Sequence, residues 1–179
     1  MSTPIDACES DETRRLAGPF VVGIDISTRA IDLVALDENE DKATWRHITI
    51  DGPDAFTRCR RIADIATFGQ MFDNAYLVAL ERPFIRKGQD VIRLAQGVLL
   101  GRIPSRLPVW EVPVSQWKNH AKIPMRDKPD ATTFPDVEWA LPVEHQDTYD
   151  ALGVAFYARD TNAAGIAAAL NPPTERTAA

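Results

Sequence analysis

Cysteine is scarce in this sequence. The chain has two, Cys8 and Cys59, which form no CxxC pair and are too few for a disulfide framework. This scarcity excludes a small secreted scaffold held by disulfides, and it predicts a reducing, cytoplasmic environment.

Long apolar runs are also absent. No stretch approaches the roughly 18 consecutive apolar residues of a membrane-spanning helix. Residues 1–18 are polar and acidic, whereas a secretory signal needs an apolar centre. We therefore expect a protein with no membrane partner.

Basic residues are the minority, but they are concentrated in one segment. The formal net charge of the chain is −6, yet residues 82–128 contain ten basic and three acidic residues, which leaves −13 for the rest of the chain. A basic block in an acidic protein is typical of a surface that faces a polyanion. The alternative is a set of solvated helix faces.

What is present indicates one α/β domain. Its 179 residues predict a domain over 19–170 between flexible tails at 1–18 and 171–179. Strands are predicted at 20–28, 31–38, 43–50, 75–81 and 107–114, the first three as an antiparallel meander. Helical spacing predicts helices over 53–72, 89–102 and 147–160, with a further short helix at 134–141. This order indicates a mixed α/β sandwich.

The first predicted strand contains an acid in an unfavourable place. In the stretch VVGIDIST, Asp25 lies among apolar residues that read as buried on both sides. A carboxylate in such a strand costs several kcal/mol unless something pairs with it. Asp25 therefore predicts a partner that the sheet must bring to it.

Three further acids are candidates for the same site. Glu81 ends the apolar strand AYLVALE, at the sheet edge where α/β sites are usually built, although it could also turn into solvent. Asp147 and Asp150 share one face of the last helix with Ala151 and Val154. Their alternative role is to cap that helix and complement its dipole.

Convergence of these four acids predicts a metal centre. If the first and fourth strands are neighbours, about 4.8 Å apart, Asp25 and Glu81 can share a cation, and the last helix can bring its two acids there. Without a cation some of the carboxylates would stay protonated. Oxygen ligands favour Mg²⁺, with Mn²⁺ as a substitute, and we expect two ions with Asp25 bridging them.

The ordered motifs resemble those of the ribonuclease H-like superfamily, and within it those of RuvC-type Holliday junction resolvases. The motifs are GIDIST around Asp25, VALERPF around Glu81, RLAQGVLLGRI (93–103), LPVWEVPVSQWK (107–118) and DTYDALGVAFYA (147–158). The resemblance covers most of residues 20–160. It implies a five-stranded mixed sheet, three antiparallel strands and then two parallel ones, with helices on both faces.

The resemblance also implies an activity. Asp25, Glu81, Asp147 and Asp150 would be the catalytic, metal-binding carboxylates of a homodimeric endonuclease that nicks four-way DNA junctions symmetrically. The products would carry 5′-phosphate and 3′-hydroxyl ends. A seam between the two copies is expected at Gly97 and Gly101, which could instead serve packing within one chain.

DNA contacts are predicted along the basic segment. Phe84 would insert between bases near the cut, although core packing is the commoner role of a lone phenylalanine. Four basic side chains are expected to contact phosphates: Arg86, Lys87, Lys118 and Lys122.

Two other functions remain open from the sequence. A nuclease for RNA–DNA hybrids, replication forks or flaps would use the same four acids. The motif GIDIST also resembles the phosphate loop of actin-like and sugar-kinase-like ATP-binding proteins, but those need two such domains, and the role of Glu81 and of the two helix acids would be unexplained.

Overall fold

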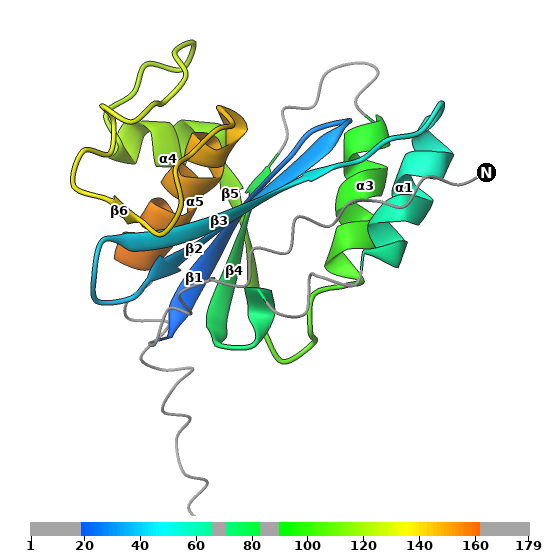
Figure 1. Cartoon of the computed structure of the whole chain (residues 1–179), viewed down its shortest axis with the longest axis horizontal. Helices are drawn as coiled ribbons and strands as arrows, with labels where there is room; N and C mark the ends of the chain where they lie inside the picture. Colours follow the sequence, from blue (N-terminus) through cyan, green and yellow to red (C-terminus); the bar gives the residue numbers. More distant parts are fainter. Residues whose placement is uncertain (1–18, 66–70, 83–89, 162–179) are drawn as a thin grey trace, which may run out of the picture.

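The computed structural model describes residues 19–65, 71–82 and 90–161. They form one mixed sheet with helices on both faces (Figure 1). The strands lie in the order β5-β4-β1-β2-β3-β6, with bounds Val109–Pro113, Ala75–Arg82, Phe20–Ile26, Ala30–Asp37, Lys42–Thr49 and Glu138–Trp139.

The first three strands form the expected antiparallel meander. The turn between β1 and β2 is held by Ser27, whose Oγ accepts hydrogen bonds from the backbone N–H groups of Arg29 and Ala30. The turn between β2 and β3 is held by Asp37, whose Oδ1 accepts hydrogen bonds from the backbone N–H groups of Asn39 and Glu40. Short polar side chains thus satisfy the backbone where the strands reverse.

Parallel strands extend the sheet on the other side of β1. Strand β4 pairs with β1, and β5 pairs with β4, both in parallel, as expected. Such pairs need a crossover, and the helices α1 (Ala55–Asp64) and α3 (Asp90–Leu100) lie along these connections. Helix α1 begins after Asp54, whose side chain accepts from the N–H of Thr57 and caps the helix.

The sheet separates two apolar cores, one on each of its faces. Helices α1 and α3 cover one face, while α4 (Val114–His120) and α5 (Asp147–Thr161) cover the other (Figure 1). Alternate strand residues supply the two cores: Val22 and Ile24 of β1 belong to the first, and Val21 belongs to the second. Two faces with separate cores explain why the strands read as almost continuously apolar.

The structure corrects the sequence prediction at several points. The sheet has six strands instead of five, because Glu138–Trp139 pairs in parallel with β3. This pairing also shows that the short helix predicted at 134–141 is wrong: Ala140 donates its N–H to the carbonyl of Ala43. Helix α4 was not predicted at all. Both predicted tails lie outside the described residues.

Among the described residues, no helix is long and apolar enough to cross a bilayer. The cytoplasmic location stays a prediction.

Candidate metal centre

Two of the predicted acids lie side by side on neighbouring parallel strands. Ile24 of β1 is in register with Leu80 of β4, so Asp25 and Glu81 follow at the same level. Ile24 and Leu80 both belong to the core under α1 and α3. Because side chains alternate along a strand, Asp25 and Glu81 point to the opposite face, toward α5. This placement agrees with the prediction that Asp25 and Glu81 lie on adjacent strands and share a face.

Helix α5 brings the other two acids to this point. One carboxylate oxygen from each of Asp25, Asp147 and Asp150 lies within 4.8 Å of the others. Helix α5 can approach because β1 has Gly23 beneath it: a Cβ there would lie 2.1 Å from the carbonyl oxygen of Ala151. The small residue in GIDIST therefore sets the distance between the sheet and the helix that carries two of the acids.

The fourth predicted acid has one oxygen engaged elsewhere. Glu81 lies beside the three converging acids but is not part of the set within 4.8 Å. Its Oε2 accepts a hydrogen bond from Trp117 Nε1 at 2.9 Å, and its backbone carbonyl accepts from Gln96 Nε2 at 2.8 Å. Helices from both faces therefore fix Glu81 in place.

Burial and mutual repulsion raise the pKa values of three acids at this site, Asp25, Glu81 and Asp150. Burial, followed by the charge of Glu81 and those of the helix acids, raises the pKa of Asp25 well above its usual range. Burial and the charge of Asp150 raise the pKa of Glu81 to about 7. Burial also raises the pKa of Asp150 to about 6, although Lys118 and Lys128 oppose the shift. The cluster lacks positive charge.

One lysine supplies part of that missing charge. Lys128 lies on the loop between α4 and β6, and its Nζ is 3.1 Å from Asp147 Oδ1. The neighbouring carboxylates in turn raise the pKa of Lys128, first through the hydrogen bond with Asp147. The ammonium group is thus a cation held at the edge of the acidic cluster.

A second lysine anchors the same loop from within. Lys118 of α4 is buried, with 7% of its surface exposed, and its Nζ donates to the carbonyl oxygens of Met125 and Asp127 at 3.1 and 2.7 Å. These bonds fasten the loop that presents Lys128. Direct phosphate contact by Lys118, as the sequence predicted, is disfavoured because its ammonium is already buried and bonded.

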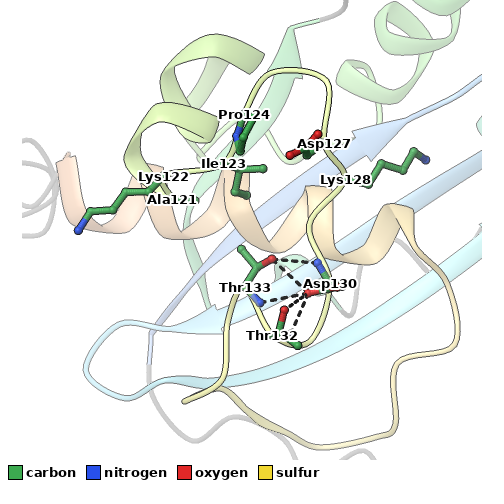
Figure 2. A pocket seen from close by; sticks show the side chains of 9 residues that line it. All are labelled: Ala121, Lys122, Ile123, Pro124, Asp127, Lys128, Asp130, Thr132 and Thr133. Carbon is green, nitrogen blue, oxygen red and sulfur yellow. Dashed lines mark hydrogen bonds between the residues drawn. The ribbon is translucent and has the colours of Figure 1, made fainter.

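The loop lines an open polar pocket of about 430 Å³. Figure 2 shows that Lys122 and Lys128 extend in opposite directions from the loop, away from each other. Asp130 closes the turn by accepting from the backbone and side chains of Thr132 and Thr133. Lys122 is exposed and adopts a positive φ of 58°. Its side chain is therefore free of the core, as its predicted DNA contact requires.

The remaining predicted DNA contacts, Phe84, Arg86 and Lys87, lie outside the described residues. Sequence reasoning also missed two residues next to the acids: Trp117, which donates to Glu81, and Asp32, the cross-strand partner of Asp25. No helix was predicted around Trp117, and nothing in the sequence indicated its hydrogen bond to Glu81. Asp32 on β2 was not singled out, although it is an acid inside an apolar strand, the same pattern that identified Asp25.

The residues fit a hard divalent cation. The donors are all carboxylate oxygens, which Mg²⁺ and Mn²⁺ prefer. Burial first, and then the charges of neighbouring acids, raise the pKa values of Asp25, Glu81 and Asp150, and a bound cation would offset both effects. Asp25, Asp147 and Asp150, with the free oxygen of Glu81, would hold the metal. When bound, such an ion polarises a phosphate and lowers the pKa of a coordinated water.

Comparison with solved structures shows that this chain shares its fold with RuvC. RuvC from Thermus thermophilus in complex with a Holliday junction substrate aligns with a TM-score of 0.62 and 17% identity, over 82% of this chain and 96% of that chain. A second Thermus thermophilus RuvC structure gives 0.62 and 18%, over 82% and 97%. The yeast mitochondrial Holliday junction resolvase Ydc2 gives 0.46 and 12%, over 85% and 80%.

No protein-family model matches the chain. No curated protein matches it in sequence.

Proposed function

We propose that this protein is a Mg²⁺-dependent endonuclease that cuts four-way DNA junctions. The observation that carries the proposal is the convergence of Asp25, Asp147 and Asp150 within 4.8 Å on a RuvC-type fold. Junction DNA is proposed because a RuvC of this fold was solved with a Holliday junction substrate. RNA–DNA hybrids and forks are the competing substrates.

The proposed chemistry is phosphodiester hydrolysis that leaves 5′-phosphate and 3′-hydroxyl ends. The four carboxylates would hold two Mg²⁺ ions, with Mn²⁺ as a substitute. Burial of Asp25 and Glu81 keeps bulk water from screening the site, so a bound cation would be held strongly there. Trp117 fixes one oxygen of Glu81 and leaves the other for the metal.

A homodimer follows from the proposed substrate. A four-way junction offers two strands related by two-fold symmetry, and two identical sites would nick both. Helix α3 is the proposed seam because its outer face is open: a Cβ on Gly97 would meet nothing within 4 Å, and Leu94 is 51% exposed. This openness favours the dimer seam over close packing of these glycines within one chain.

The proposed DNA-facing surface is the basic segment 82–128. Lys122 would contact phosphates directly, as would Arg86 and Lys87, with Phe84 near the cut. Lys118 would act indirectly, by holding the loop that carries Lys128. Lys128, already drawn to the acids, is the lysine best placed to meet a phosphate bound there.

The central experiment is cleavage of labelled four-way junctions, flaps, forks and RNA–DNA hybrids with Mg²⁺. We expect paired, religatable nicks in junctions, and we expect Asp25→Asn or Asp150→Asn to abolish cleavage while binding persists. Each substitution keeps the shape and removes a charge, so folding should survive. With Ca²⁺ the parent should bind but cleave little.

Asp73→Asn is the matched control, since Asp73 is exposed and precedes β4 at the opposite end from Glu81. It should cleave like the parent. If the protein cleaves hybrids or flaps in preference to junctions, the nuclease site stands but four-way junctions are not its substrate. Normal cleavage by Asp25→Asn on every substrate would overturn the nuclease site itself.

A further inference from the structure

A row of polar side chains crosses the sheet beneath the first turn of α5. Asp25 of β1 is the cross-strand partner of Asp32 of β2, and Asp32 is the partner of His47 of β3. Asp32 is 2% exposed, yet it is not one of the three acids that converge within 4.8 Å. A buried carboxylate next to four partly buried ones requires a physical reason.

Its presence has an electrostatic cost. After burial and the nearer acids, the charge of Asp32 contributes to the raised pKa of Asp25. An uncharged residue of similar size at this position would lessen the repulsion. The compensation must come from what Asp32 contacts.

Two donors converge on one oxygen of Asp32. Thr148 Oγ1 donates to Oδ1 at 2.8 Å, and His47 Nδ1 donates to the same atom at 3.0 Å. Thr148 is fully buried and lies in the first turn of α5, between Asp147 and Asp150. The bond therefore joins the sheet to the turn that carries both helix acids.

The geometry of a helix makes this bond decisive for those acids. Each residue turns the helix by about 100°, so Asp147 and Asp150 point to one side of α5 while Thr148 points to another, over β2. Because the first turn is rigid, fixing the direction of Thr148 fixes the directions of both acids. Without that bond, the turn could rotate or lift from the sheet.

A second contact holds the chain that enters α5. The ring of His145 stacks on that of His47, with 3.7 Å between centroids and 14° between planes. The carbonyl oxygen of His145 accepts the backbone N–H of Thr148 at 3.2 Å. His47 thus contacts Asp32, which accepts from the Thr148 hydroxyl, and also His145, two positions before the first residue of the helix.

We propose that Asp32 is a positioning residue that, through Thr148 and His47, orients Asp147 and Asp150 for metal binding without itself binding the metal. The inference rests on the proposed function, because it assigns a role within that site. It predicts that the hydroxyl of Thr148 matters for metal affinity even when the fold is intact.

The test is the affinity of the free protein for Mn²⁺, measured by electron paramagnetic resonance well below the unfolding temperature, together with junction cleavage. Thr148→Val keeps the shape and removes the donor. We expect it to weaken Mn²⁺ binding and to lower kcat by about 10–100-fold, the usual range for groups that orient metal ligands. KM for junction DNA should change little, and Thr148→Ser should restore both quantities.

Thr44→Val is the matched control. Thr44 is 7% exposed and its Oγ1 has no hydrogen-bond partner among the described residues, so the same substitution should leave metal affinity unchanged. His47→Ala is a second variant in case Thr148→Val does not fold: His47 is partly exposed, and losing it removes one of the two donors to Asp32. It should also weaken Mn²⁺ binding.

The outcomes separate this inference from the proposed function. If the parent binds Mn²⁺ and cleaves, but Thr148→Val (or His47→Ala, should the first not fold) binds as tightly, the positioning role is overturned alone. If Thr148→Ser fails to restore what Thr148→Val loses, packing rather than the hydroxyl is responsible and the inference also falls. If the parent binds no Mn²⁺ and cleaves nothing, both fall together.

Discussion

At the scale of single residues, Glu81 and Asp150 make the metal-free protein sensitive to pH. The pKa of Glu81 is raised from 4.5 to about 7, and that of Asp150 from 3.8 to about 6. Between about pH 4 and pH 7 the folded chain therefore holds more protons than the unfolded chain. The free energy of unfolding should fall as pH rises through this window, by a few kcal/mol.

Urea denaturation in EDTA at several pH values from about 4 to 8 measures this decline. Glu81→Gln should flatten it, because that side chain no longer titrates. Saturating Mg²⁺ should flatten it as well, because a cation favours the charged carboxylates. Equal slopes for Glu81→Gln and the parent would show that Glu81 is not the titrating group.

Lys128 should compete with the metal. Its Nζ lies 3.1 Å from Asp147 Oδ1, where a cation would also be attracted. Lys128→Met should therefore tighten Mg²⁺ binding to the DNA-free protein a few-fold, since an exposed ion pair is worth up to about 1 kcal/mol. The shift of the unfolding temperature with Mg²⁺ concentration measures this affinity.

Lys122→Met is the control, because Lys122 lies on the same loop but is directed away from Lys128 (Figure 2). It should leave the Mg²⁺ affinity unchanged. Tighter Mg²⁺ binding in both variants would indicate a general effect of the net charge.

Single residues also show where sequence reasoning succeeds. Asp25 was identifiable because an acid within an apolar strand needs a partner, and Asp147 and Asp150 because their spacing puts them on one helix face. Trp117 was not, because its bond to Glu81 joins residues 36 positions apart in the chain. Asp32 carried a readable pattern, but only the strand register shows that it lies next to Asp25.

At the scale of elements, the contact between α5 and β1 is the most sensitive to a change in size. A Cβ at Gly23 would lie 2.1 Å from the carbonyl oxygen of Ala151 and 2.8 Å from the Cβ of Ala155. Gly23→Ala should push α5 from the sheet, destabilise the fold by about 1–3 kcal/mol or more, and reduce cleavage.

Gly97→Ala is the matched control in α3, where the added methyl meets nothing within 4 Å. It should stabilise the protomer by up to about 1 kcal/mol, because alanine is the better helix former. Thermal denaturation of both variants measures the contrast. A Gly23→Ala protein as stable as the parent would mean that α5 does not approach β1 as closely as described.

The elements that the sequence failed to predict depend on tertiary contacts. Helix α4 follows β5 without a loop, because Pro113 is both the last residue of the strand and the N-cap of the helix. The strand pattern in LPVWEVPV therefore conceals where the helix begins. Strand β6 has only two residues and exists because β3 offers an open edge. Its apolar neighbours Phe134 and Val137 are three residues apart, which is a helical spacing, but here both pack against the core beside α5.

By contrast, strands β1 to β4 and helices α3 and α5 have strong local periodicity and were predicted to within a few residues. Helix α1 ends at Asp64, earlier than expected.

At the scale of the whole molecule, the uneven charge should govern DNA binding. Residues 82–128 are strongly basic in an acidic chain, so junction affinity should fall steeply with salt as phosphate contacts release counterions. Neutralising Arg86 and Lys87 together should weaken binding to all junction sequences equally and reduce the salt slope by about 2. Neutralising Arg60 and Arg61, which lie outside the basic segment, is the charge-matched control. Equal slopes for the two double variants would place the DNA surface elsewhere.

The proposed dimer has consequences that depend on the whole assembly. Leu94 is 51% exposed on α3, beside the open surface of Gly97. If this helix forms the seam, Leu94→Glu should convert a dimer into a monomer at micromolar concentration, because it would bury two unpaired charges across the two-fold axis. The variant should still nick junctions, but the two nicks should become uncoupled. Leu141→Glu, at an exposed leucine that follows β6, should remain dimeric and nick in pairs. Sedimentation and a supercoiled cruciform assay, in which paired nicks linearise the plasmid, measure both effects. A parent that sediments only as a monomer and still linearises the cruciform would rule out the symmetric dimer.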